Sequence, residues 1–121
     1  MEVQKFNIPK NVAVVIGCSD IVYEIASVFR KIYVIVNSEE VARKIKHMKN
    51  VGIVVAEKVV DFDFDVDLVL FVKEVDENYL NWAVKKSKLI VVEIDEKSVK
   101  EILKSKCSRV EIGEGFVFAI P

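Results

Sequence analysis

The chain of 121 residues contains no threonine, one histidine, two cysteines and four glycines. Two cysteines cannot form a disulfide framework, and no cysteine or histidine spacing matches a zinc site. With His47 as the single histidine there is no credible Ser/His/Asp set, and the chain has no Gly-x-x-x-x-Gly-Lys phosphate loop. These absences exclude the commonest hydrolase and phosphate-loop motifs, and we expect no metal site.

Long apolar runs and an excess of one charge are missing as well. The formal net charge is −1, whereas a general nucleic-acid-binding surface needs an excess of Lys and Arg on one face. No apolar run approaches the roughly 20 residues of a membrane helix, and the polar start over residues 1–5 is no signal peptide. We therefore expect a cytoplasmic protein that binds neither nucleic acid in general nor membranes.

The residues that are abundant indicate one packed domain. Hydrophobic residues make up 52% of the chain and charged residues 31%, which is typical of a single globular core spanning residues 1–121. Lys, Glu, Val and Ile dominate, and Gln4 is the only glutamine. This composition is typical of proteins from a high-temperature source.

Apolar runs alternate with helical patterns along the chain. Runs rich in Val, Ile and Leu predict strands at residues 11–17, 32–37, 51–56, 66–72 and 89–94. Helices are predicted at residues 21–29, 38–48 and 77–87, the second capped by Ser38 and the third by Asp76. A further helix is predicted after an Asp95 cap, and its residues Val99, Ile102 and Leu103 are expected to face inward. Two short runs around residues 113–115 predict a β-hairpin. This order predicts an α/β fold: a three-layer, Rossmann-like, mostly parallel sheet with a C-terminal antiparallel β-hairpin.

The joint between the first predicted strand and helix is the most informative local feature. A dinucleotide-binding fold places three glycines there, and this chain has Gly17, Ser19 and Val22 at those places. Cys18 precedes the helix, but His47 is predicted at the opposite edge of the sheet. We therefore favour a small packed residue over a reactive thiol. Asp20 is predicted to cap the helix, and its charge disfavours a pyrophosphate.

The element order, five strand–helix units closed by a β-hairpin, resembles that of the class I S-adenosylmethionine-dependent methyltransferases over residues 11–121. Residues 16–18 resemble the start of that family's glycine loop, and residues 33–40 its second strand and helix start. Residues 50–57 and 64–70 resemble its third and fourth strands. The resemblance implies S-adenosylmethionine as the cofactor and methyl transfer as the activity.

The same resemblance implies a cofactor site. Its residues would be Gly17, Cys18, Ser19, Asp20, Asn37 and Glu57. The backbone of residues 17–19 would lie near the methionine part, Asn37 near the ribose and Glu57 near the adenine. Because ligands of open α/β sheets bind outside the carboxyl ends of the strands, we expect these residues to line a pocket there.

Several motif positions depart from the family pattern. Val15 stands where the family has an acid, and Ser19 and Ile21 stand where it has glycines. The acid that binds both ribose hydroxyls falls on Val36 or, one residue later, on Asn37. An amide offers one acceptor oxygen, so we expect weak binding. Residues 71–74 also lack the Asn/Asp-Pro-Pro-aromatic motif of members that methylate amino groups.

A second resemblance leads to the alternative function. The nucleotide-binding domains that regulate potassium transport have a similar strand–glycine–helix joint, with an acid about 20 residues on where this chain has Asn37. The alternative is therefore a non-catalytic regulatory or subunit module that binds NAD, ATP or AMP. The hairpin fits the methyltransferase order better. A nucleotide-type small molecule is the expected partner, and a homo-oligomer or hetero-oligomer is left open.

Two further clusters have ordinary interpretations. Asp61, Asp63, Asp65 and Asp67 alternate with apolar residues, so an extended segment would place all four on one face. We favour a solvated face over a weak cation site there. Tyr79 and Trp82 lie three residues apart beside the core stripe of their helix, where packing is favoured over a substrate or subunit contact.

Overall fold

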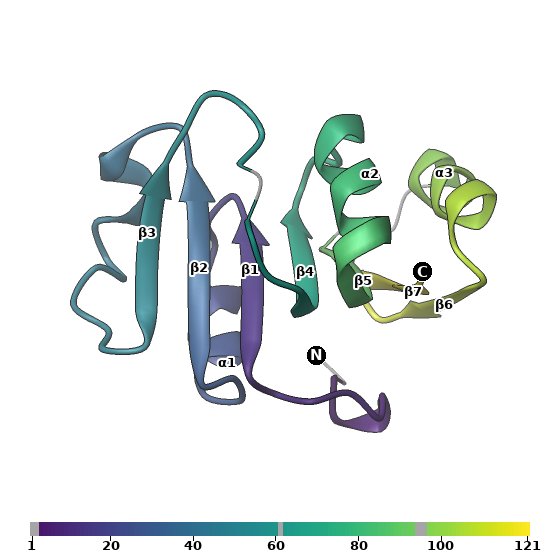
Figure 1. Ribbon diagram of the computed structural model, residues 1–121, viewed down its shortest axis with the longest axis horizontal. Helices are drawn as coiled ribbons and strands as arrows, with labels where there is room; N and C mark the ends of the chain where they lie inside the picture. Colours follow the sequence, from purple (N-terminus) through teal and green to yellow (C-terminus); the bar gives the residue numbers. More distant parts are fainter. Residues whose placement is uncertain (1–2, 61, 94–96) are drawn as a thin grey trace.

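The computed structural model describes residues 3–60, 62–93 and 97–121, and these residues form one seven-stranded sheet. The strands are β1 (Val12–Ile16), β2 (Lys31–Val36), β3 (Val51–Val55), β4 (Val66–Val72), β5 (Ser87–Glu93), β6 (Arg109–Gly113) and β7 (Phe116–Ile120). Their order across the sheet is β3-β2-β1-β4-β5-β7-β6, with β3 at one edge of the view in Figure 1 and the hairpin at the other.

The sheet is parallel except at its C-terminal end. Strands β1 to β5 pair in parallel, which is the arrangement that apolar strands connected by crossovers adopt. Strand β7 runs antiparallel to both β5 and β6, and Gly115, with φ 76°, forms the turn between β6 and β7. The predicted α/β fold with an appended hairpin is confirmed.

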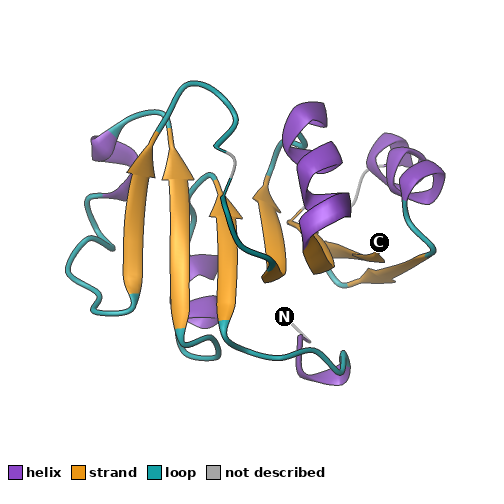
Figure 2. Cartoon of the chain, in the orientation of Figure 1, coloured by secondary structure: helices purple, strands orange, loops and turns teal. Residues whose placement is uncertain are grey.

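Two apolar cores lie on opposite faces of the sheet. One contains helix α1 (Ile21–Ala26) and the 3₁₀ helices η1 (Val3–Lys5) and η2 (Glu39–Ala42). The other contains helices α2 (Glu77–Lys86) and α3 (Lys97–Lys106), with α2 in front of the sheet and α1 behind it in Figures 1 and 2. Within the described ranges, no helix is long and apolar enough to cross a membrane.

The predicted helix over residues 38–48 is wrong. The chain there forms only η2 followed by turns, and the Ser38 side chain makes no capping hydrogen bond. Helices of this length depend on burying an apolar face, and Ala42 and Ile45 are the buried residues of this segment. The basic residues that follow Ala42 gain nothing from a regular helix at the edge of the sheet.

The helix ends test the capping predictions for Asp76 and Asp20. The Asp76 carboxylate accepts hydrogen bonds from the N–H groups of Asn78 and Tyr79, as predicted for α2. Asp20 makes no such bond at the start of α1. The predicted Asp95 cap lies outside the described residues, and Ile102, which was expected to face inward, is 42% exposed on α3.

The acidic alternation before β4 does not form one face. The backbone bends at Asp63 and Phe64, and strand β4 begins only at Val66. Asp67 is 7% exposed, and its carboxylate accepts hydrogen bonds from the N–H groups of Asn11 and Val12 at 2.9 and 3.1 Å. The solvated interpretation therefore holds for Asp63 and Asp65 and is wrong for Asp67, because the backbone of β1 replaces water around its carboxylate. Asp61 lies outside the described residues.

Candidate functional site

A pocket of about 370 Å³ opens at the carboxyl ends of β1, β2 and β4. Strand β1 lies between β2 and β4. The order in which successive strands are added to the sheet therefore reverses at β1, and open α/β sheets bind ligands at such a point. The pocket is lined by the apolar residues Ile16, Ile35, Val36, Val41, Ala56, Val72 and Val75, together with Gly17, Asn37, Glu74, Asp76 and Tyr79. Of the six predicted site residues, Gly17 and Asn37 therefore meet in one pocket.

Gly17 is required by the close approach of β1 to the neighbouring strand β4. Its φ is +100°, and a Cβ added here would lie 3.0 Å from Cβ of Val72 at the end of β4. Its N–H donates to the carbonyl oxygen of Ile35 at 2.9 Å, which extends the β1–β2 ladder by one residue. The glycine thus lets β1 end tightly against β4, and this packing alone accounts for its presence.

The end of β4 carries a strained turn beside the pocket. Lys73 has φ 67°, and the N–H of Glu74 donates to the carbonyl oxygen of Val72 at 2.8 Å. A hydrogen bond that spans one residue of positive φ is the pattern of a γ-turn, which is rare and strained for a residue other than glycine. The turn directs the chain from β4 to Glu74, a carboxylate of the pocket.

Asn37 and Glu57 follow neighbouring strands but are placed differently. Asn37 comes directly after β2 and lines the pocket with an exposed side chain. Ala56 extends β3 by donating its N–H to the carbonyl oxygen of Val36 at 2.9 Å and also lines the pocket. Glu57, the next residue, is exposed and is not part of the pocket lining. The predicted adenine contact at Glu57 stays a prediction.

Ser19 is bonded to β5, and residues 18–20 do not line the pocket. The Ser19 hydroxyl donates to Oε2 of Glu93, at the end of β5, at 2.8 Å and accepts the N–H of Ile21 at 3.3 Å. Ser19 therefore takes the capping role that Asp20 was predicted to fill. Burial raises the pKa of the Cys18 thiol, and the nearby Asp20 carboxylate raises it further. A raised thiol pKa supports the interpretation of Cys18 as a packed residue.

Tyr79 fixes one wall of the pocket. Its hydroxyl donates to the carbonyl oxygen of Lys58 at 3.2 Å and accepts the N–H of Val60 at 3.1 Å. These two bonds tie the segment after β3 to helix α2. Burial raises the pKa of the Tyr79 phenol, the hydrogen bond from Val60 lowers it, and the Asp76 carboxylate raises it.

Glu74, Asp76 and Tyr79 were not among the predicted site residues. The rule that pockets form at the carboxyl ends of parallel strands could have indicated Glu74, because it lies two residues beyond the fourth predicted strand. Tyr79 could not have been found this way, since only the fold brings α2 beside the segment that follows β3.

The described pocket lining contains two carboxylates, Glu74 and Asp76, and no Lys or Arg. Such a lining favours a cationic or neutral ligand over a phosphate, which needs positive charge or free N–H groups. Within the described ranges, no group of three or more His, Cys, Asp and Glu could hold a metal ion. His47 is exposed on the turns beyond η2.

The sequence matches no protein-family model and no curated protein at a significant level. Solved structures, in contrast, match the fold over almost the whole chain. The N-methyltransferase NodS from Bradyrhizobium japonicum, in complex with S-adenosyl-L-homocysteine, has a TM-score of 0.70 at 12% identity, covering 97% of this chain and 79% of NodS.

Two further solved structures are similar to the same extent. Precorrin 8w decarboxylase from Methanobacterium thermoautotrophicum has a TM-score of 0.65 at 18% identity, with 93% of this chain and 82% of that chain covered. Magnesium protoporphyrin IX methyltransferase from Synechocystis, with bound S-adenosylmethionine, has a TM-score of 0.64 at 12% identity, with 98% and 73% covered. Together with the strand order and the hairpin, these matches establish that the chain has the Rossmann-like fold of the class I S-adenosylmethionine-dependent methyltransferases.

Proposed function

We propose that this protein is methyltransferase-like and binds S-adenosylmethionine weakly in the pocket at the ends of β1, β2 and β4. One observation carries the proposal: the pocket at the reversal of strand order is lined by carboxylates and contains no described Lys or Arg. S-adenosylmethionine has a sulfonium and an ammonium cation against one carboxylate, so its net charge is positive, and it has no phosphate. NAD, ATP and AMP all carry phosphate, which two neighbouring carboxylates repel.

The lining suits the parts of an adenosyl group. Val41, Ala56 and Val75 offer apolar contact for a purine, and Asn37 lies beside them at the end of β2. The Asn37 amide oxygen would accept a bond from one ribose hydroxyl. Glu74 would face the cationic end of the ligand. The bound cofactor supplies an activated methyl group, and the chain's own residues hold and orient it.

The expected affinity is low because one charged interaction is missing. A hydrogen bond to a charged group contributes about 1.5–3 kcal/mol, so an amide in place of a carboxylate weakens binding by about ten- to a hundredfold. The loop of residues 18–20 does not compensate, since Ser19 is bonded to Glu93.

Asn37→Asp tests the proposal. Isothermal titration calorimetry with S-adenosylmethionine should give weak binding for the unmodified protein and about ten- to a hundredfold tighter binding for Asn37→Asp. Asn7→Asp, an equally exposed Asn outside this pocket, adds the same charge and should leave the affinity unchanged.

The same titrations with S-adenosylhomocysteine, NAD, ATP and AMP separate the alternatives. Binding of a phosphorylated nucleotide without S-adenosylmethionine would replace the proposal with the non-catalytic nucleotide-binding module. Tight binding of S-adenosylmethionine by the unmodified protein would contradict the proposal that the site is weak. If neither the unmodified protein nor Asn37→Asp binds, the chain keeps the scaffold without the site.

A further inference from the structure

The two edges of the sheet differ in how they are protected. Edge strands commonly carry charged residues or proline, which prevent pairing with another chain. Strand β6 carries Arg109 and Glu111, and Lys5 lies 3.7 Å from the Glu111 carboxylate. Strand β3, at the other edge, reads Val-Gly-Ile-Val-Val and has neither a charge nor a proline. The β3 edge is therefore the unprotected one.

The backbone of β3 offers free hydrogen-bonding groups at this edge. Asn50 and Ala56 bond to β2, to Ile32 and Val36 respectively. Since backbone groups alternate along a strand, those of Ile53 and Val55 face outward. Among the described residues, neither Ile53 nor Val55 has a backbone hydrogen bond on that side. Two N–H and two C=O groups are thus free to pair.

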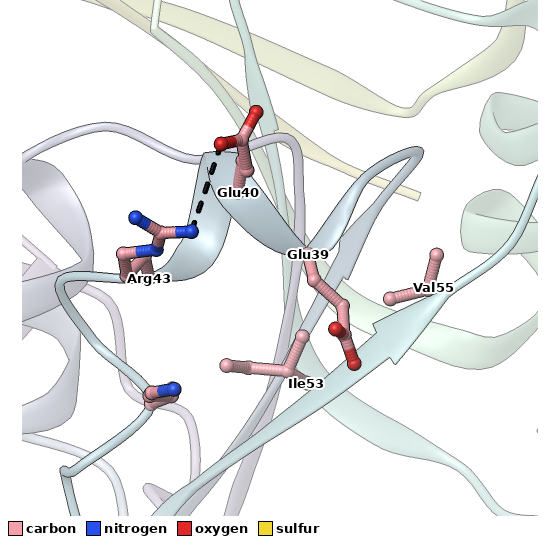
Figure 3. Close-up of a pocket in the computed structure, with 6 residues that line it drawn as sticks. Glu39, Glu40, Arg43, Ile53 and Val55 are labelled. Carbon is pink, nitrogen blue, oxygen red and sulfur yellow. Dashed lines mark ion pairs between the residues drawn. The ribbon is translucent and has the colours of Figure 1, made fainter.

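A groove lined by Ile53, Val55 and four charged residues lies beside the same edge. The side chains of Ile53 and Val55 lie on one face of β3 and line a pocket of about 260 Å³ between β3 and η2, shown in Figure 3. Val55 is 49% exposed. In Figure 3 the Glu39 side chain extends from η2 toward β3, and Arg43 is paired with Glu40.

Charge is polarised along the segment between β2 and β3. This segment starts at the carboxyl edge of the sheet with Glu39 and Glu40 and returns to the amino edge with exposed basic residues. Among the described residues, neither Glu39 nor Lys46 has an ion-pair partner. A second copy rotated by a two-fold axis would bring the acidic end of one segment to the basic end of the other. The surface is therefore complementary to itself.

We propose that β3 pairs with β3 of a second copy of this chain, antiparallel and about a two-fold axis at Val54. In this register Ile53 faces Val55 of the partner subunit, and Val55 faces Ile53 of the partner subunit. The outward N–H and C=O groups of both residues are satisfied in both copies. Ile53 and Val55 form two apolar cross-strand pairs, and Glu39 approaches Lys46 of the partner subunit. The pairing closes on itself, so it gives a dimer and no filament.

Sedimentation equilibrium tests the proposal with two matched variants. The unmodified protein should be a dimer. Val55→Glu places a carboxylate beside Glu39 in the interface and should weaken dimerisation by about tenfold or more. Ile112→Glu makes the same change at the protected edge, where Ile112 is 54% exposed, and should leave the dimer intact. A monomer at all concentrations, or a dimer lost in Ile112→Glu and kept in Val55→Glu, would overturn the proposal.

Charge-reversal variants and amide hydrogen exchange test the proposed dimer even if Val55→Glu does not fold. Glu39→Lys and Lys46→Glu should each weaken the dimer, and the double variant should restore it because the two charges meet across the axis. In the unmodified protein, the amides of Ile53 and Val55 should exchange with solvent more slowly as the protein concentration rises. Exchange that is independent of concentration, or no recovery in the double variant, would contradict the pairing.

Discussion

Gly17 and Lys73 lie at the carboxyl ends of the adjacent strands β1 and β4, and both have positive φ, 100° and 67°. Gly17 adopts this conformation without strain, whereas Lys73 does so at a cost of order 1–3 kcal/mol. Strain of this size persists where the surrounding structure fixes the backbone, and functional sites are where it is commonly found. The strained residue Lys73 thus lies between Val72 and Glu74, which both line the candidate pocket.

Tyr79 should make stability depend on alkaline pH. Its pKa is raised above the ordinary value of 10.0, chiefly by burial, so the folded state keeps a proton that the unfolded chain has lost. The contribution of Tyr79 to stability is complete below that ordinary value and declines as the pH rises through and above it.

Urea unfolding at a series of alkaline pH values measures this effect. Tyr79→Phe should be less stable than the unmodified protein at neutral pH, because the bonds to Lys58 and Val60 are lost. Above the ordinary tyrosine pKa its stability should fall less steeply with pH. Equal slopes for the two proteins would show that burial of the phenol does not shift its titration.

At the scale of elements, the helices differ in what holds their first turns. Helix α2 has ten residues, a double side-chain cap from Asp76 and four buried side chains, Tyr79, Leu80, Trp82 and Ala83. Helix α1 has six residues and takes its cap from Ser19 rather than from Asp20. The segment after η2 forms no regular helix at all. Helix formation in this protein thus follows the apolar surface that each segment can bury.

Asp76→Ala and Asp20→Ala form a matched pair for the capping assignment. Loss of the Asp76 cap should cost about 1 kcal/mol of unfolding free energy, because two backbone N–H groups lose their acceptor. Asp20 caps nothing, and its removal should stay within about 0.5 kcal/mol. Urea unfolding followed by the fluorescence of Trp82 measures both. A larger loss for Asp20→Ala than for Asp76→Ala would contradict the assignment.

For the whole molecule, Asp67 joins the two halves of the sheet. The boundary between β1 and β4 divides the sheet into one half with β3, β2 and β1 and another half with β4, β5, β7 and β6. The carboxylate of Asp67, at the start of β4, binds the start of β1 through two N–H groups and lies 3.4 Å from Nζ of Lys88 in β5. One buried side chain thus couples strands from both halves.

Asp67→Ala should destabilise the whole domain by about 2–3 kcal/mol, since the N–H groups of Asn11 and Val12 lose a charged acceptor. Asp67→Asn keeps one acceptor oxygen and should lose less. Asp65→Asn, at an exposed aspartate of the same run, should change stability by less than about 0.5 kcal/mol. Urea midpoints at constant slope measure the three variants, and similar losses for Asp65→Asn and Asp67→Asn would show that Asp67 does not couple the halves.

The sequence by itself determined the strands, the hairpin and the fold class. Runs such as residues 66–72 and 116–120 are apolar throughout or nearly so, and burial within a sheet is the arrangement that satisfies them. The Asp76 cap could also be predicted from the sequence, because it depends on residues two and three positions away in the chain. The resemblance to the class I methyltransferases implied Gly17 and Asn37 as site residues, and both stand at the carboxyl ends of predicted strands, where open α/β sheets bind ligands.

Only the tertiary structure decided the remaining features, because they depend on groups far apart in the chain. The Ser19–Glu93 bond joins residues 74 positions apart. The burial of Asp67 requires the β1 backbone, 55 and 56 positions away. The segment over residues 38–48 has a helical pattern, yet it forms only η2 and turns, with Ala42 and Ile45 as its buried residues. Local patterns record what each segment favours, and the packing of distant segments decides which of those preferences are met.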